Sequence, residues 1–176
     1  KNYFVDTALS TFFKKIGLFK LSKFFLYEIK SHEHAHKVKK IVGEKIWSTY
    51  YKFCVEREPV DKCLSYYFMR KNSPTSSKKR KHMTWPDFVR KANFPIDYNF
   101  YTYNDELIID KIINYENLNT ELNEIFNYLN LPLKKLEKKI NNTYRENIDF
   151  EILNSERKSI YNAFKKTLTF TGYSIK

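Results

Sequence analysis

The stretch FCVEREPVDKCLSYY, residues 53–67, combines an apolar run, an arginine and a proline followed by a helical pattern. Residues 50–55 predict a buried strand, and Pro59 suits the first turn of the next helix, where its missing N–H costs nothing. Arg57 then falls at the carboxyl end of the strand, where open α/β sheets bind ligands. A helix start also offers free N–H donors to an anion. From these residues alone, the stretch favours an ion pair between Arg57 and Asp61, with a phosphate-binding turn as the alternative.

Strand and helix patterns alternate along the rest of the chain. Strands are predicted at 2–5, 50–55 and 107–116, and helices at 8–20, 33–42, 44–50, 59–70, 84–92, 118–130 and 155–172. The connections are longer than hairpins need, which favours one α/β domain over residues 1–176, a three-layer sandwich with a central, mostly parallel sheet. Residues 71–83 are expected to form a basic loop excursion, and residues 93–105 an irregular aromatic segment.

The composition indicates a folded, basic chain. Of the 176 residues, 42% are hydrophobic and 18% are aromatic, and the formal net charge is +12. The apolar content excludes a disordered chain. The charge predicts an anionic partner, such as a nucleotide, a nucleic acid, an acidic glycan or a membrane surface, unless it reflects a lysine-rich background. No run approaches the roughly 18 apolar residues of a membrane-spanning helix. Cys54 and Cys63 lack CxxC spacing, so free thiols in a reducing interior are expected.

Several motifs, in order over about residues 30–176, resemble the carbohydrate sulfotransferase family, particularly its short bacterial and viral-type members. That family has a strand, then Arg-x-Pro, an Asp-Arg/Lys pair and Ser-x-Tyr, and REPVDKCLSYY at 57–67 is similar. Four further segments resemble its approach to the strand, its Phe-centred helix, its strand–turn–helix step and its C-terminal helix: 43–53, 84–92, 110–132 and 143–174.

The resemblance implies a P-loop nucleoside-triphosphate-hydrolase-like sulfotransferase fold. It also implies transfer of a sulfuryl group from 3′-phosphoadenosine-5′-phosphosulfate (PAPS) to a hydroxyl of a glycan or another acceptor. By the same resemblance, Arg57 and Ser65 hold the 3′-phosphate of this nucleotide donor, and Tyr144 and Arg145 lie near the nucleotide. The alternative is a catalytically inactive binding or structural protein with the same fold, such as a subunit of a larger assembly.

The N-terminal segment departs from the family pattern. The family carries a loop of the Pro-Lys-Thr-Gly type that wraps the 5′-phosphosulfate, and here Thr7, Ser10 and Thr11 resemble only the tail of that loop. The Pro-Lys pair is missing, and Asp6 would repel a sulfate where a cation is expected. Either a complete loop lies outside these residues, or the loop is degenerate and the fold no longer transfers sulfate.

The tract HEHAH, residues 32–36, supplies the candidate general bases. Sulfuryl transfer needs a base for the acceptor hydroxyl, and imidazole titrates near neutral pH. His32 matches a histidine of the family pattern and ranks first, His34 second, and Glu33 is a weaker candidate. The alternative is solvated histidines on a basic helix, where His32 and His36 would share one face. No metal site is predicted, because no Cys or Asp accompanies the tract.

The run KKRK, residues 78–81, is typical of a nucleic-acid-binding or nuclear-targeting patch. With the sulfotransferase resemblance, it is interpreted instead as an exposed loop near the acceptor cleft that attracts an acidic glycan, and no specific nucleic acid is expected. A plain solvated loop is the alternative interpretation.

Overall fold

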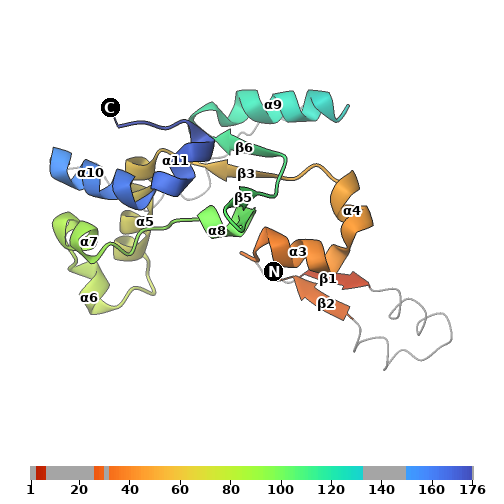
Figure 1. Cartoon of the computed structure of the whole chain (residues 1–176). Coiled ribbons are helices and arrows are strands. Elements are labelled where there is room, and N and C mark those ends of the chain that lie inside the picture. The colour runs from red at the N-terminus through yellow and green to blue at the C-terminus, as the bar shows by residue number, and fades with distance from the viewer. Residues whose placement is uncertain (1–2, 7–25, 30–31, 133–149, 176) are drawn as a thin grey trace. The chain divides into compact units, whose positions relative to one another are not determined.

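The computed structural model describes residues 3–6, 26–29, 32–132 and 150–175. The chain divides into two compact units: unit 1 contains residues 1–52 and 98–110, and unit 2 contains residues 53–97 and 111–176. The described residues are mixed α/β and mostly helical, with three two-stranded sheets, one of them parallel (Figure 1). The prediction of a mixed α/β chain is confirmed at this level.

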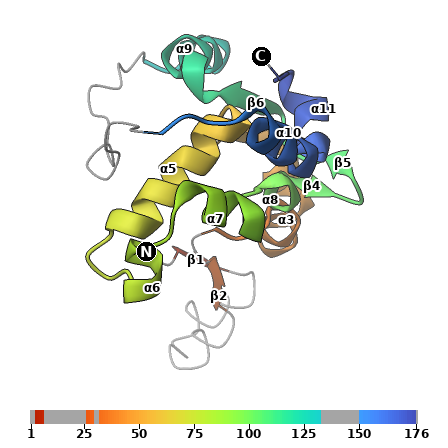
Figure 2. The same cartoon turned by 90° about the vertical axis from the view of Figure 1, so that its left-hand side faces the viewer.

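Unit 2 is built on the parallel pair. Strand β3 (Phe53–Glu56) pairs with β6 (Lys111–Asn114). Helix α9 (Leu118–Tyr128) lies on one side of the pair and α5 (Pro59–Asn72) on the other, as Figures 1 and 2 show together. Because both strands run the same way, their carboxyl ends meet at one edge, and the turn into α5 lies at that edge.

The core of unit 2 is largely aromatic and lies under α5. Helices α7 (Trp85–Lys91) and α10 (Asn154–Ala163) pack against α5. The buried cluster consists of Val60, Cys63, Leu64, Tyr67, Phe68, Trp85, Phe88, Val89, Ile160, Tyr161 and Phe164. The rings of Tyr67 and Trp85 meet edge to face, with centroids 5.6 Å apart. Such pairs add about 0.5–1.5 kcal/mol beyond area burial, so α5 is held firmly.

Local residues set the helix ends, as the sequence predicted. Pro59 occupies the first turn of α5, and the Glu58 carboxylate accepts from the N–H of Asp61 at 2.7 Å. Thr84 caps α7, and its hydroxyl accepts from the N–H of Asp87 at 3.3 Å. The C-terminal region forms two helices, α10 and α11 (Lys165–Thr171), where one was predicted. A left-handed glycine ends α11 at the expected residue, as its φ of 71° shows.

The basic loop predicted at 71–83 holds more structure than expected. Helix α5 extends to Asn72, and a single helical turn, α6, follows at Lys78–Lys81. The N–H of Arg80 donates to the carbonyl of Ser77 at 2.9 Å, which closes this turn. Hydrophobic periodicity could not reveal α6, because none of its four residues is apolar.

Unit 1 combines helices with two antiparallel strand pairs. Strand β1 (Tyr3–Asp6), predicted at 2–5, pairs with β2 (Leu26–Ile29). The helices are α3 (Ala35–Val42), α4 (Glu44–Thr49) and the single turn α8 (Tyr98–Tyr101). Gly43, with φ of 82°, separates α3 from α4, as the sequence predicted.

The aromatic segment 93–105 was predicted to be irregular, but it contains α8 and one strand of a hairpin. Strand β4 (Thr102–Tyr103) pairs with β5 (Glu106–Leu107). The turn consists of Asn104 and Asp105, both with positive φ, as the hairpin turns that match the sheet twist require. The strand predicted at 107–116 is accordingly divided between β5 in unit 1 and β6 in unit 2.

Several sequence predictions fall outside the described residues: the helix at 8–20, the loop residues Thr7, Ser10 and Thr11, and the pair Tyr144 and Arg145. Among the helices that the structure describes, none has both the length and the apolar character needed to cross a bilayer.

Candidate functional site

Arg57 lies directly after β3, at the carboxyl edge of the parallel pair, as predicted. Its Nε donates to Oδ2 of Asp61 on α5, and its guanidinium lies over the ring of Tyr115, 4.4 Å from the centroid. Tyr115 directly follows β6, so groups from both strand ends meet at Arg57. The side chains of Arg57 and Asp61 are 22% and 27% exposed, and this ion pair therefore remains open to solvent.

Ser65 lies on the same face of α5 as Asp61. The two residues are four apart on one helix, which places their side chains one above the other. Ser65 is partly exposed. Arg57 contacts Asp61, one turn before Ser65 on the same face of α5.

Carboxylates surround Arg57. The Glu58 side chain occupies the start of α5, and Glu116 accepts from the Glu58 N–H at 3.1 Å. Tyr161 donates its hydroxyl to Glu58 at 2.7 Å, and Tyr173 donates to Glu116. Burial first, and the neighbouring carboxylate second, raise the pKa of each tyrosine, which keeps both hydroxyls protonated as donors. At this turn, the positive charge of Arg57 therefore lies among several negatively charged carboxylates.

A second ion pair lies one residue away and is closed to solvent. Nζ of Lys62 lies 2.6 Å from Glu56, whose side chain is 1% exposed, and 2.8 Å from Asp97. Burial alone would lower the pKa of Lys62, but Glu56 and Asp97 outweigh it and the pKa rises. The other carboxylate oxygen of Glu56 is buried without a hydrogen bond to the described residues. One cation thus faces two carboxylates, of which Glu56 is buried and Asp97 is 48% exposed, and Lys62 compensates the buried charge of Glu56.

The two cysteines are free, as expected, and both lie near this network. Burial raises the pKa of Cys54 to about 12, with a further contribution from Glu56. Burial likewise raises the pKa of Cys63 to about 12. Neither thiol is thus activated as a nucleophile, because the thiolate is scarce at neutral pH.

In unit 1, contacts with Asn99 and Phe100 orient His34. His32 is exposed, precedes α3 and has φ of 61°, so the alternative in which it shares a helix face with His36 is wrong. Nδ1 of His34 lies 2.8 Å from the carbonyl oxygen of Asn99, and its ring stacks on Phe100 with centroids 4.6 Å apart. A carbonyl only accepts, so Nδ1 carries the proton and the Nε2 lone pair can take another. The geometry favours His34 over His32 as a base.

His36 lies between two cavities of unit 1. Its Nδ1 is buried without a hydrogen bond to any described residue, and its ring centroid is 5.1 Å from that of Tyr103. Burial lowers the pKa of His36, and the charges of His34, Lys40 and Lys37 lower it further against the opposite effect of Glu33. His36 is therefore a neutral imidazole near pH 7.

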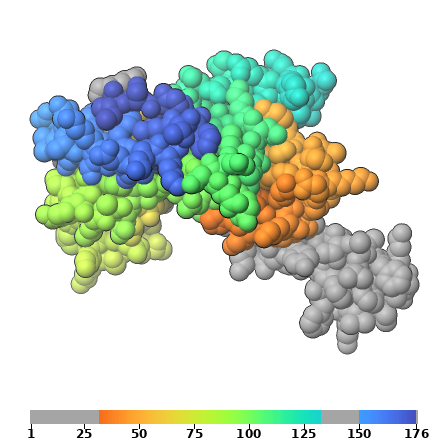
Figure 3. Space-filling model, viewed as in Figure 1, coloured from red at the N-terminus to blue at the C-terminus, as the bar shows by residue number. Residues whose placement is uncertain are grey.

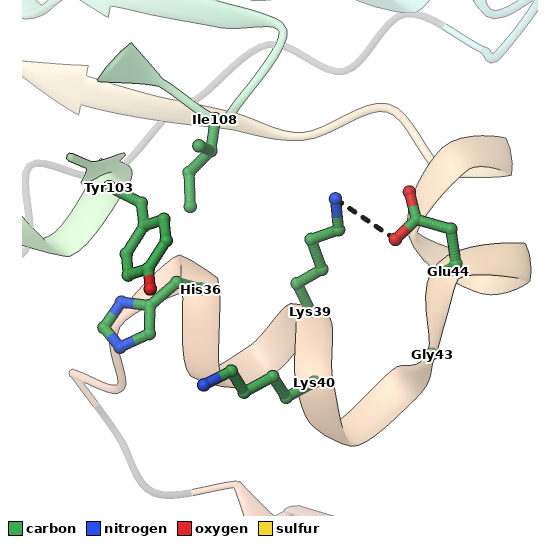
Figure 4. Close-up of a pocket in the computed structure, with 7 residues that line it drawn as sticks. All are labelled: His36, Lys39, Lys40, Gly43, Glu44, Tyr103 and Ile108. Atoms are coloured by element: carbon green, nitrogen blue, oxygen red, sulfur yellow. Dashed lines mark ion pairs between the residues drawn. The ribbon is translucent and has the colours of Figure 1, made fainter. Parts of the chain in front are cut away.

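The larger of these cavities measures about 400 Å³ and lies between α3, α4 and the β4–β5 segment. Its lining residues are His36, Lys39, Lys40, Gly43, Glu44, Tyr103 and Ile108. Figure 4 shows the Tyr103 hydroxyl directed at the His36 ring, with Lys39 paired to Glu44 at 3.1 Å. The second cavity, about 370 Å³, is lined by His34, His36, Asn99, Thr102, Tyr103, Asn104 and Asp105. A hydroxylated ligand would find imidazole, amide and hydroxyl groups there.

Sequence reasoning did not assign a role to His36 or Tyr103. The alternation of HEHAH offered a signal for His36, because both histidines that follow His32 at every second residue line a cavity. Nothing in the local sequence marked Tyr103, which the β4–β5 hairpin brings to α3. Among the described residues, no group of three or more His, Cys, Asp or Glu side chains is arranged to hold a metal ion.

The chain has a relative among curated proteins. A protein of Archaeoglobus fulgidus, described as uncharacterized, is 32% identical over 119 residues, which cover 64% of this chain and 94% of that protein. The chain belongs to the same protein family as this archaeal protein. No protein-family model matches the chain. No solved structure matches it either.

Proposed function

We propose that this chain is a sulfotransferase that moves a sulfuryl group from PAPS to a hydroxyl of a carbohydrate-type acceptor. The proposal includes the three-layer, mostly parallel fold of the P-loop-like sulfotransferases. The observation that carries it is the position of Arg57 at the carboxyl edge of the β3–β6 pair, held over Tyr115 and in contact with Asp61, one turn before Ser65 on the same face of α5.

In this proposal the 3′-phosphate of the donor takes the place of Asp61 at Arg57. A phosphate presents two oxygens to the guanidinium fork, and such charge-assisted contacts are about twice as strong as neutral hydrogen bonds. The ring of Tyr115 holds the guanidinium plane by a cation–π contact while its partner changes. The Ser65 hydroxyl adds one donor, Thr7, Ser10 and Thr11 would contact the 5′-phosphosulfate, and Tyr144 and Arg145 would lie near the nucleotide.

The acceptor side of the reaction requires a base, and His34 is the proposed one. Its Nε2 takes the proton of the acceptor hydroxyl as the oxygen forms a bond to sulfur. The bond between sulfur and the bridging oxygen breaks, and adenosine 3′,5′-bisphosphate leaves with that electron pair. The hydrogen bond from Nδ1 to Asn99 fixes the tautomer that can accept at Nε2.

A second candidate is a non-catalytic binding or structural protein with the same fold. The Asp61 carboxylate favours it, because it already pairs with the guanidinium, and the nearby carboxylates of Glu58 and Glu116 add negative charge that opposes an incoming phosphate. In that case Arg57 stabilises the turn, and the chain has no nucleotide site there.

Calorimetric titration with 3′-phosphoadenosine-5′-phosphate separates the two candidates. Arg57→Ala should weaken binding by about 2–4 kcal/mol, roughly 30- to 1000-fold, and Arg57→Lys should recover only part because an ammonium lacks the planar fork. Asp61→Asn should tighten binding, since it removes the competing charge. Arg90→Ala is the matched control, because Arg90 also pairs with an aspartate of unit 2. A folded wild-type protein that binds no nucleotide at millimolar concentration would refute the proposal.

Sulfate transfer to a glycan acceptor tests the base. His34→Gln should lower the turnover rate by about 10²–10⁴-fold while nucleotide affinity stays unchanged. His32→Gln is the control from the same tract and should keep the rate. Equal losses in both variants would mean that neither histidine is the specific proton acceptor.

A further inference from the structure

A basic pocket of about 330 Å³ lies in unit 2, apart from the residues assigned above. Its lining residues are Arg70, Ser77, Lys79, Arg80, Met83, Phe88, Lys91 and Asn93. Cations from α5, α6 and α7 face this pocket, and no acidic residue lines it. Figure 3 shows the α6–α7 segment, in yellow-green, at the molecular surface. We refer to this cavity as the α5–α7 pocket.

The pocket has a fixed floor. The Tyr67 hydroxyl, from the core face of α5, donates to the carbonyl of Met83 at 2.9 Å and so anchors the link between α6 and α7. Nη1 of Arg70 donates to the Tyr66 hydroxyl at 3.1 Å, and its guanidinium lies over the Tyr66 ring. Nζ of Lys91 lies 3.7 Å from Sδ of Met83. These contacts orient cations around the pocket at little further entropic cost.

The α5–α7 pocket carries more positive charge than the surrounding segment compensates. Residues 71–93 contain a single acid, Asp87, whose carboxylate pairs with Arg90 outside the lining and also attracts Lys91 of the lining. Like charges brought close together repel one another, and an anion between them removes this repulsion and adds attraction to each. The pocket should therefore bind a compact anion that carries more than one negative charge.

We propose that the α5–α7 pocket binds a sulfate or phosphate ester group carried on a sugar. A tetrahedral oxyanion ester accepts hydrogen bonds on several sides at once, which suits donors that converge from three helices. Ser77 and Asn93 offer neutral polar groups for sugar hydroxyls. This assignment does not require sulfuryl transfer at Arg57.

A nucleic acid suits the pocket less well. Single strands bind through aromatic platforms on which bases stack, but Phe88 of the lining is 2% exposed and the Tyr66 ring is covered by Arg70. Met83 is the remaining large apolar side chain of the lining, and it offers no flat ring.

The run 78–81 contains its own control. Lys79 and Arg80 line the pocket, whereas Lys78 and Lys81, on the same helical turn, do not. The variants Lys79→Gln/Arg80→Gln and Lys78→Gln/Lys81→Gln therefore carry the same change in net charge. They differ only in whether the lost charges face the pocket.

Binding is measured on the full chain at one fixed low ionic strength, by titration with a sulfated disaccharide, a sugar phosphate and the unmodified disaccharide. The Lys79→Gln/Arg80→Gln protein should bind the charged sugars about 10- to 100-fold more weakly, and the Lys78→Gln/Lys81→Gln protein within about 3-fold of wild type. The preference between the first two sugars distinguishes a sulfate from a phosphate source. Lys91→Gln, on α7, should weaken the binding of both charged sugars in the same way. Because this variant leaves α6 unchanged, its weaker binding could not be due to a folding defect of α6.

Four results would overturn the proposal. If the two double variants weakened sugar binding equally, the net charge of the chain, and not the pocket, would explain the binding. Binding of the unmodified disaccharide as tight as that of the charged sugars would remove the need for an anion, and a single-stranded oligonucleotide preferred over both sugars would indicate a nucleic-acid site. Arg57→Ala should leave sugar binding intact, so a loss in that variant would assign the anion to the Arg57 turn instead.

Discussion

Two ion pairs begin at consecutive residues of the same turn and differ in almost every physical respect. Glu56 and Lys62 meet inside unit 2, with side chains 1% and 13% exposed, whereas Arg57 and Asp61 are 22% and 27% exposed. Strand side chains alternate between faces, so residue 56 points inward and residue 57 outward. The inner pair is covered at Glu56, and its third member, Asp97, is 48% exposed at the surface, whereas both members of the outer pair are partly exposed.

The difference shows that burial decides whether an ion pair between a basic and an acidic side chain is needed for stability or contributes little to it. A buried charge without its partner is costly, so the inner pair must persist in the folded chain. A partly exposed pair contributes little to stability, because water and salt compensate for its loss. The exchange of a carboxylate for a phosphate at Arg57, which the proposed function requires, would therefore carry no large folding cost.

The largest effect is expected when the inner pair is broken. Lys62→Met should lower the free energy of unfolding by about 3–5 kcal/mol, because Glu56 stays buried with no cation beside it. Urea denaturation monitored by circular dichroism measures this loss. Arg90→Met is the comparison, since its pair with Asp87 lies at the surface and should cost at most about 1 kcal/mol.

The double variant Glu56→Gln/Lys62→Met sharpens this test. It should recover part of the lost stability, because no unpaired charge remains inside. If Lys62→Met cost no more than Arg90→Met, the inner pair would be no more important than a surface contact.

A smaller effect is expected at the outer pair. Arg57→Ala should change the free energy of unfolding by at most about 1 kcal/mol, since Asp61 remains in contact with water and with the start of α5. The measurement is the same denaturation curve, combined with the nucleotide titration. A stability loss of the size expected for Lys62→Met, together with unchanged nucleotide affinity of the folded fraction, would make Arg57 a structural residue.

The smallest effect is expected from pH in unit 1, at His36. Its pKa in the folded chain is lowered from the ordinary 6.5, so the unfolded chain binds a proton more readily. The contribution to stability is fully present above pH 6.5 and is lost as pH falls through the lowered value. Unfolding measured at pH 7.5 and pH 5 should show a loss on acidification that His36→Gln reduces. Identical losses in both proteins would exclude His36 as the titrating group.

Some predictions succeeded because their causes are local. Pro59, Thr84 and Gly172 mark helix boundaries through a fixed φ, a side-chain cap and a left-handed φ, and each acts within a few residues. The turn of Asn104 and Asp105 was missed, although residues tolerant of positive φ favour hairpins. The predicted strand at 107–116 failed as one element, since its apolar run could not show that its two ends belong to different units.

The candidate site was predictable only in part. The position of Arg57 follows from the strand pattern and from Pro59. The ion pair between Arg57 and Asp61, which the sequence analysis named, is present in the structure. The preference for His34 over His32 depends on the carbonyl of Asn99, which is 65 residues away in the chain. The Glu56–Lys62–Asp97 network similarly joins α5 to the segment after α7, and no spacing rule connects those residues.

Local sequence patterns were sufficient to predict the mixed α/β character, the main helix ends and the place of Arg57 at a strand end. These features arise from periodicity, backbone preference and capping, which act over one or two turns. Tertiary packing set the parallel pairing of β3 with β6, which charges are buried and which are exposed, which histidine ring is oriented, and that Lys79 and Arg80 line a pocket with Arg70 and Lys91. Burial and the convergence of separate helices depend on how distant segments pack together, so a local sequence pattern cannot predict them.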